Sequence, residues 1–380
     1  MLTRRQLIAT AALAGVGAAG ASVFYGARSS AEYERAVART WRHGDEKGDE
    51  KGDEKGYTAS APMRELVRYA TLAPSSHNTQ CWKFGIAGQS VSILPDYERR
   101  CPIVDPDDHH LFTSLGCAAE NLVQAAAAIG LHGDVTFNDG AAESLDIALE
   151  PAKVVRSPLF EAIPYRQSTR GEFDGRSLSG DDLALLQKAG TGPGVRVLLL
   201  TDRQVMAQVL DFVIEGNTAQ MRDPAFVREL KQWIRFDGRQ AATSGDGLYA
   251  GASGNPTAPP WLGSRLFDLF FTEADENDKY AAHMRSSAGI AVFASDRDDK
   301  AHWIEAGRAF QRFALQATAL GVRTAHLNQP VEVAALRPRF ARLIGLEHDR
   351  PDLVIRFGRG PAMPRSLRRP VEAVLTRVPG

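Results

Sequence analysis

Two stretches of the chain share the same glycine spacing and small residues, and they limit the possible folds more than any other feature. They read GCAAENLVQAAAAIG (116–130) and GRAFQRFALQATALG (307–321). Apolar residues recur at helical spacing in both, which predicts two largely buried helices that end at glycine caps. The similarity suggests an internal duplication, although alanine-rich helices also resemble one another by chance. Alanines coincide at Ala118/Ala309, Ala126/Ala317 and Ala128/Ala319.

The coarse pattern of the remaining chain mixes helices with short strands. Helices are expected over 61–71, over 110–130 and in LSGDDLALLQKAG, where Ser179 before two aspartates is typical of a helix start. Because the elements do not alternate as regular βαβ units, we expect an α+β fold with a mainly antiparallel sheet flanked by helices. Strands are expected in CWKFGIAG and VSILP and over 135–137, 145–151, 195–200, 289–295 and 353–358.

Charge and cysteine content exclude several functions. A net charge of −1 over 380 residues gives no field that would recruit nucleic acid or an anionic membrane. The three cysteines include no C-x-x-C pair, so we expect free, mostly buried thiols; export would allow one disulfide. His109 and His110 lie beside two aspartates, but adjacent histidines are expected to point apart, so no metal site is predicted.

The N-terminus carries a pattern typical of export. Arg4 and Arg5 precede the apolar run LIATAALAGVGAAGASVF, which predicts a twin-arginine signal or anchor over 1–28. An amphipathic or chance helix is the alternative. No clear A-x-A site follows, so an uncleaved anchor stays open. We therefore expect a periplasmic or membrane-anchored protein, with the twin-arginine machinery as a partner and membrane contact only through an uncleaved signal.

Two further segments are low in regular pattern. Residues 44–56 read GDEKGDEKGDEKG, and such a charged repeat cannot bury a core, so 29–60 is predicted to be a disordered linker. The folded halves are then expected over 61–157 and 158–380. Within the second half, 236–264 is rich in glycine, serine and proline and too long for an ordinary connection. It is interpreted as an active-site lid, with a mobile linker as the alternative.

Four polar or basic stretches could form a binding site. LAPSSHNTQCW (72–82) packs small polar residues between apolar ones, and AHLNQP (325–330) offers amide groups to a heterocycle. In YRQSTRGEF (165–173), alternate residues would share one face of an extended segment, which suits an anion. In MPRSLRRP (363–370), prolines flank three arginines. Taken alone, each of these stretches is also compatible with solvated surface.

Competing chemistries have weaker support. GTGPG (190–194) precedes a strand, whereas a dinucleotide-binding loop lies between a strand and a following helix. Ser75 and Ser76 do not stand in a G-x-S-x-G elbow, so a serine hydrolase is not expected.

Together and in this order, APSSHNTQCW, R-x-S-x-R, the glycine-bounded helix and the P-R-S-x-R-R-P tail resemble the nitroreductase superfamily of FMN proteins, and more narrowly its Acg-like branch. The resemblance runs from about Arg64 to Leu375, excluding 236–264. It implies an internally duplicated nitroreductase-like fold in which one chain imitates the usual homodimer. One departure is Cys81, which stands where the family usually has proline before Trp82. Another is AHLNQP, which lacks an acidic-glycine pair common in active members.

The resemblance also implies one FMN site, with the flavin rather than a side chain carrying the chemistry. Pro74, Ser75, Ser76 and Asn78 of the P-S-S-x-N loop would contact the ring and ribitol. The phosphate would be contacted by Arg166, Ser168, Arg365 and Arg368, and the N1/O2 edge by Arg170. The N5/O4 edge would lie near Leu327, Asn328 and Gln329 of the AHLNQP segment.

Two functions follow from the resemblance. The first is an oxidoreductase that passes hydride through flavin N5 from a small donor, such as NADPH or NADH, to a nitroaromatic, quinone or similar acceptor. The alternative is an FMN-binding or sequestering protein in which a lid covers the flavin and NAD(P)H-dependent activity is small or absent. In both, the duplicated chain is expected to be a monomer.

Overall fold

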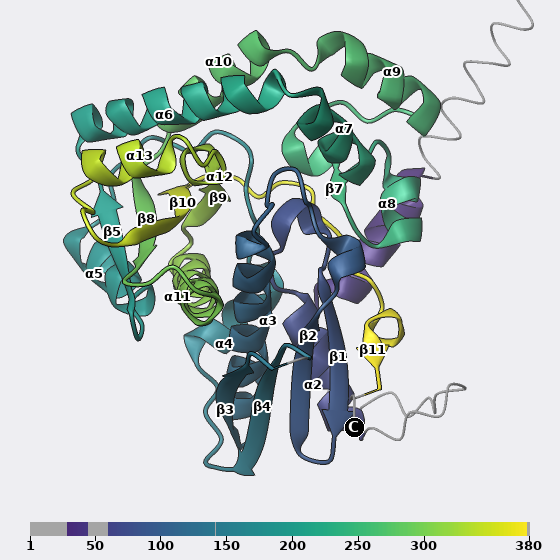
Figure 1. The fold of residues 1–380 in the computed structure, drawn as a ribbon. Helices are drawn as coiled ribbons and strands as arrows, with labels where there is room; N and C mark the ends of the chain where they lie inside the picture. The colour runs from purple at the N-terminus through teal and green to yellow at the C-terminus, as the bar shows by residue number, and fades with distance from the viewer. Residues whose placement is uncertain (1–28, 45–59, 141, 378–380) are drawn as a thin grey trace, which may run out of the picture.

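The computed structural model describes residues 29–44, 60–140 and 142–377. Two sheets form the framework (Figure 1). The first has the order β11-β1-β2-β4-β3 and the second β5-β8-β10-β9. The strands of the first sheet are β1 (Trp82–Ala87), β2 (Ser90–Pro95), β3 (Leu131–Asn138), β4 (Ser144–Pro151) and β11 (Leu375–Thr376). Those of the second are β5 (Val195–Leu200), β8 (Gly289–Ser295), β9 (Arg323–His326) and β10 (Arg350–Gly358).

Both sheets are built by the same sequence of elements. In each, a helix precedes the first strand, a long helix lies between the second and third strands, and the spatial order is first-second-fourth-third. All neighbours within these two sets of four strands are antiparallel. The repeated topology supports the duplication, and the expected α+β fold with mainly antiparallel sheets is confirmed. The helices are α2 (Ala61–Thr71) and α3 (His109–Ala128) in the first half, and α5 (Gly180–Ala189) and α11 (Lys300–Ala319) in the second.

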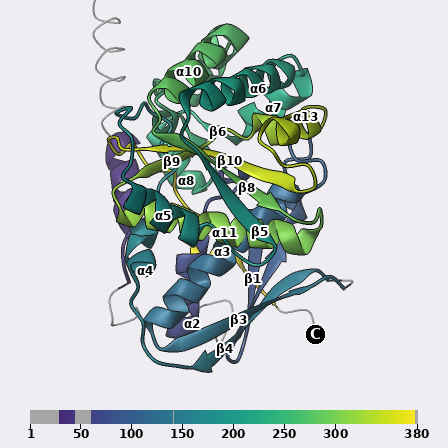
Figure 2. The same cartoon turned by 90° about the vertical axis from the view of Figure 1, so that its left-hand side faces the viewer.

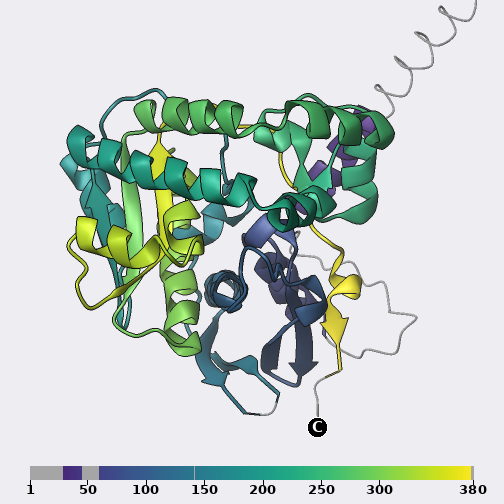
Figure 3. The same ribbon diagram turned by 45° about the horizontal axis from the view of Figure 1, so that its top comes forward.

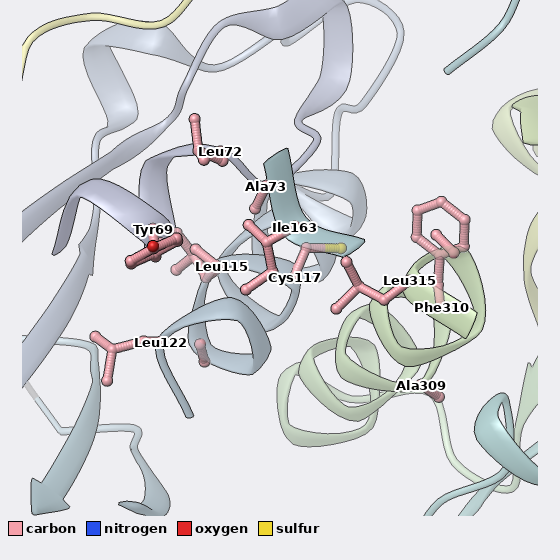
Figure 4. Packing of buried hydrophobic residues seen from close by; sticks show 14 of the residues in the cluster. Tyr69, Leu72, Ala73, Leu115, Cys117, Leu122, Ile163, Ala309, Phe310 and Leu315 are labelled. Atoms are coloured by element: carbon pink, nitrogen blue, oxygen red, sulfur yellow. The ribbon is translucent and has the colours of Figure 1, made fainter. Parts of the chain in front are cut away.

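The two long helices pack against each other between the sheets (Figures 1 and 3). A Cβ atom added to Gly116 would lie 2.0 Å from the carbonyl oxygen of Ile304, and one added to Gly307 would lie 2.0 Å from that of Thr113. The opening glycines of the repeat therefore let the two backbones touch. Figure 4 shows the buried side chains that surround this crossing.

Polar contacts across the crossing repeat the same symmetry. Gln311 donates to the Asn121 side chain at 2.6 Å, and Arg312 donates to Glu120 at 2.9 Å. In the aligned repeats Glu120 corresponds to Gln311, and Asn121 corresponds to Arg312. Exchanging the two helices therefore converts one contact into the position of the other, as expected for an approximate two-fold axis. The predicted glycine-bounded helices are thus the interface between the halves.

One large insertion distinguishes the second half. Residues 88–89 join β1 to β2, whereas 201–288 separate β5 from β8. Figure 2 shows α6 and α10 of this insertion at the end of the molecule opposite the β3–β4 hairpin. The insertion contains α6 (Arg203–Met221), α7 (Pro224–Trp233), β6 (Ile234–Arg235), α8 (Gly238–Ser244), β7 (Leu248–Tyr249), α9 (Pro260–Phe270) and α10 (Glu273–Arg285).

Three predicted boundaries need correction. Residues 29–40 are helical and pack on α8, so the linker over 29–60 is wrong for this part; 45–59 lie outside the described residues. The predicted lid over 236–264 contains helices and one short strand instead of one irregular loop. The predicted boundary of the second half is crossed at the C-terminus, because β11 joins the first sheet and pairs parallel to β1.

Short elements complete the fold: α4 (Pro158–Ala162), α12 (Gln329–Glu332), α13 (Arg337–Leu343) and the 3-10 turns η1 (Ser76–Asn78), η2 (Tyr97–Arg99), η3 (Ile163–Tyr165), η4 (Ala250–Ser253) and η5 (Val371–Ala373).

None of the helices in the described part of the chain is long and apolar enough to span a bilayer. The proposed signal over 1–28 lies outside the described residues.

The close crossing of α3 and α11 can be tested at its glycines. We expect Gly116→Ala to lower the free energy of unfolding by at least ~2 kcal/mol, because the new methyl group meets backbone that cannot rotate away. Gly180→Ala in α5 is the matched control, since a Cβ there meets nothing within 4 Å. Urea unfolding measures both. Equal stability of the two variants would contradict the crossing.

Candidate functional site

Two adjoining cavities lie where the halves and the C-terminal tail meet. The larger has a volume of about 270 Å³ and the smaller about 50 Å³. They share Pro74, Ser75 and Arg170 as walls. Every residue predicted for the site lines one or both cavities, so segments far apart in sequence do converge. The larger takes Ser76, Leu327, Asn328 and Gln329, and the smaller takes Asn78, Arg166, Ser168, Arg365 and Arg368.

The P-S-S-x-N loop has a strained backbone. His77, Asn78 and Gln80 have φ values of 46°, 53° and 54°, in the left-handed region that residues other than glycine rarely adopt. Side-chain amides hold this conformation: Asn78 Nδ2 donates to the Gly247 carbonyl at 2.9 Å, and Gln80 Nε2 donates to the Gly245 carbonyl at 2.8 Å. The insertion therefore fixes the shape of a loop that belongs to the first half.

Arg368 is the main support of this loop. Its Nε donates to Thr71 O at 2.7 Å, its Nη2 to Leu72 O and Ala73 O, and its Nη1 to Asn78 Oδ1 and Leu367 O. These bonds use all five donors of the guanidinium. The prediction that Arg368 hydrogen-bonds a phosphate is therefore wrong for this geometry, because the side chain positions the loop and contributes only its charge to the cavity.

The R-x-S-x-R stretch shows the alternation expected of it. Gln167 is bonded to Met363 N and O in the tail, and Thr169 N donates to the Thr324 carbonyl of β9 at 2.8 Å. Arg166, Ser168 and Arg170 line the cavities, and Gln167 also borders the smaller one. Only an isolated bridge at Ser168 replaces the expected strand, but the consequence for side-chain direction is the same.

Guanidinium groups dominate the smaller cavity. Arg166, Arg170, Arg365 and Arg368 form no ion pair with a carboxylate among the described residues. Burial lowers the pKa of Arg166 to about 10, and its Nε is buried without a hydrogen-bond partner. Among the described residues, the Arg365 guanidinium donates only to main-chain carbonyls, those of Pro164 and Tyr165. Several desolvated cations without acids make this end of the site suited to a bound anion.

Trp41 is a site residue that the sequence reasoning missed. Its ring lies 4.7 Å from the Arg365 guanidinium carbon and 4.9 Å from that of Arg368, and its indole N–H donates to Ser366 O at 2.9 Å. It therefore closes one wall of the smaller cavity by cation–π contact. The aromatic residues of 29–44 were the available signal, but the neighbouring charged repeat obscured it.

The larger cavity has a polar floor. Asn328 Oδ1 accepts from Val354 N at 3.0 Å, which fixes its side chain, while Gln329 Oε1 and His326 Nδ1 are buried without a partner. Burial, with the charge of Arg170 as a smaller cause, lowers the pKa of His326 to about 3, so this ring is neutral. A neutral imidazole and free amide oxygen suit the edge of a heterocycle.

Its roof comes from the insertion and combines an apolar group of side chains with polar ones such as Asn217, Glu276 and Lys279. Only part of the predicted lid takes part, namely Leu248, Ala250, Ser253 and Asn255. Helices that sequence reasoning did not place at the site supply most of the roof, since nothing local distinguishes their side chains from ordinary core. These are Met221, Phe226, Leu230, Phe267 and Phe271.

A buried histidine–aspartate cluster lies at the start of α3. Contrary to expectation, the rings of His109 and His110 are 4.7 Å apart, and ligand atoms of both lie within 4.8 Å of Asp105. Asp105 accepts from His110 N and Leu111 N, and His109 Nε2 contacts Asp352 at 3.0 Å. Burial lowers the pKa of His110, but Asp105 outweighs this and leaves it raised. These bonds explain the cluster as helix capping.

Sequence comparison finds relatives that are named as nitroreductases. No family model matches the chain. Over 82% of its length it is 26% identical to "Putative NAD(P)H nitroreductase Rv3131" of Mycobacterium tuberculosis, of which it covers 90%. It is 23% identical to "Putative NAD(P)H nitroreductase acg" of the same organism, of which it covers 94%. The expected resemblance to nitroreductases and the Acg-like branch is therefore confirmed in sequence.

Solved structures match about half of the chain. An FMN-bound nitroreductase of Desulfitobacterium hafniense is 14% identical with a TM-score of 0.38, covering 59% of this chain and 100% of that one. The FMN-dependent nitroreductase NfnB of Mycobacterium smegmatis, solved with NADPH, is 11% identical with a TM-score of 0.35, covering 53% and 87%.

The role of Arg368 can be measured without a ligand. We expect Arg368→Lys to lower the free energy of unfolding by ~2–4 kcal/mol, because an ammonium cannot satisfy five buried acceptors. Arg196→Lys is the control, since its side chain is 57% exposed and pairs with Asp349 at the surface. Urea unfolding without added flavin compares them. A similar, small effect of both changes would show that Arg368 does not support the loop.

Proposed function

We propose that this protein binds FMN and is an oxidoreductase of the nitroreductase type. The observation that carries the proposal is a group of arginines with no carboxylate partner among the described residues, beside a larger cavity with a polar floor and a partly aromatic roof. The sequence relatives named NAD(P)H nitroreductases support it independently. A phosphorylated, planar heterocycle satisfies both ends of such a site.

The residues present fit this cofactor. Arg166 would bind the phosphate through its unpartnered Nε, with Ser168 and the remaining donors of Arg365 beside it. Arg170 stands in the walls of both cavities and would place positive charge beside the ring. Pro74 and Ser76 would line the ring from the first half, and Leu327, Asn328 and Gln329 from the second.

Bound FMN supplies two-electron transfer between a reduced donor and an acceptor. The chain's own contribution is binding, orientation and water exclusion. Arg170 adds positive charge, which favours a reduced, anionic ring, and its burial strengthens this effect. The aromatic roof provides a surface on which a planar donor or acceptor can stack. We propose NADPH or NADH as the donor and a nitroaromatic or quinone as the acceptor.

One observation favours a second function. The insertion covers the larger cavity with Phe226, Phe267 and Phe271, and a tight cover would keep NAD(P)H from the flavin. The protein would then store or sequester FMN.

We further propose that one chain is a functional monomer exported by the twin-arginine route. The α3–α11 crossing already joins two related halves, so no second copy is needed to complete the cavities. The paired arginines before the apolar run of 7–24 motivate the export proposal.

Phosphate recognition gives a direct test. We expect Arg166→Ala to raise the Kd for FMN by ~10–100-fold, because a charge-assisted hydrogen bond is lost, and to leave riboflavin binding nearly unchanged. Arg176→Ala is the control, since its side chain is 81% exposed. Fluorescence titration of both flavins measures the effect. An equal loss for FMN and riboflavin would refute the phosphate assignment.

Reduction by a nicotinamide nucleotide separates the two functions. We expect the purified protein to be yellow and to bleach when NADPH is added under anaerobic conditions, as followed by flavin absorbance. The same protein in the same anaerobic buffer without NADPH serves as the blank. A protein that stays yellow would support sequestration, and a colourless protein that takes up no FMN would contradict both functions.

A further inference from the structure

Helix α9 has two apolar faces with different surroundings. On its inner side, Phe267 and Phe271 line the larger cavity. On its outer side, Leu266, Leu269 and Phe270 are 37%, 68% and 64% exposed. At 100° per residue these three positions lie within about 100° of the helix circumference and so share one face. The outer face is therefore a continuous strip of large apolar side chains in contact with solvent.

This strip is unusual for a surface helix. Single exposed apolar residues are common, but a cluster of large ones marks an interaction surface. The charge of α9 itself is small, since Asp268 is paired with Lys231 at 2.6 Å and Arg265 is the other charged residue of the helix. A partner that fits must therefore be apolar, not strongly anionic.

The described chain begins beside α8, close to the start of α9. Ser29 Oγ accepts from Arg239 N at 2.9 Å at the start of α8, and a Cβ on Gly238 would meet Ser29 O at 2.9 Å. Phe236, two residues before Gly238, packs on Gly263 of α9. In the sequence, the apolar run of residues 7–24 immediately precedes this point.

We propose that α9 docks on the surface of a lipid bilayer, with Leu266, Leu269 and Phe270 at the boundary between headgroups and acyl chains. A helix with leucine and phenylalanine side chains on one face is typical of such interfacial contact. The apolar run of residues 7–24, which precedes Ser29 in the sequence, would enter the same bilayer and raise the local concentration of α9 there. The proposal does not depend on flavin chemistry, but it would place an apolar acceptor one helix away from the larger cavity.

The test uses the full chain and phosphatidylcholine vesicles. We expect vesicles to slow amide hydrogen exchange over 260–270, which the N-terminal run alone cannot do. The double variant Leu269→Glu/Phe270→Glu should lose this protection, and its vesicle partition in flotation should fall by about tenfold or more. Leu185→Glu in α5, where the side chain is also exposed (45%), should retain both.

Circular dichroism and flavin content confirm that each variant is folded. Flotation without protection of 260–270 would mean that the N-terminal run binds alone, and would overturn the proposal. Protection without vesicles that grows with protein concentration would identify a second copy as the partner. Protection without vesicles at every concentration would show that another part of the chain covers the strip. Either result also overturns the proposal.

Discussion

The contact between the backbones of α3 and α11 is the constraint on which the rest of the structure depends. Gly116 and Gly307 allow each helix to touch the carbonyl of the other, and no side chain fits between them. This contact sets the distance between the two sheets, and so fixes where the P-S-S-x-N loop lies relative to β9 and the tail. The cavities exist because two related halves meet at one close crossing.

The sequence predicts the architecture well because its strongest signals are local. Glycine-bounded apolar repeats and short alternating runs identified both long helices and most strands. The alternation of the R-x-S-x-R stretch correctly predicted that Arg166, Ser168 and Arg170 line the cavities, although Gln167 borders the smaller one too. The roof was not foreseen, because Phe226 and Phe267 are ordinary amphipathic positions until the insertion folds over the site. The structured part of 29–60 was missed because the tertiary contacts of Tyr33 and Trp41 are with residues more than three hundred positions away.

Arg368 shows where motif and geometry separate. Its place in a basic tail suggested phosphate binding, yet its five donors bind oxygens of 71–73, Asn78 and Leu367. Residue type and spacing indicate that a cation is needed, but not whether it meets a ligand or a loop. Only the count of satisfied donors distinguishes these roles. Arg166, with a buried nitrogen lacking a partner, is the opposite case.

The return of the C-terminal tail to the first sheet orders events in folding. Residues 363–370 bring Arg365 and Arg368 to the cavity, and β11 then pairs with β1, nearly three hundred residues earlier in the chain. Contacts of such long sequence separation close late, because the loop entropy must be offset by structure already formed. The basic end of the site is therefore expected to be completed only after both halves have folded, so its geometry exists only in the native topology of the whole chain.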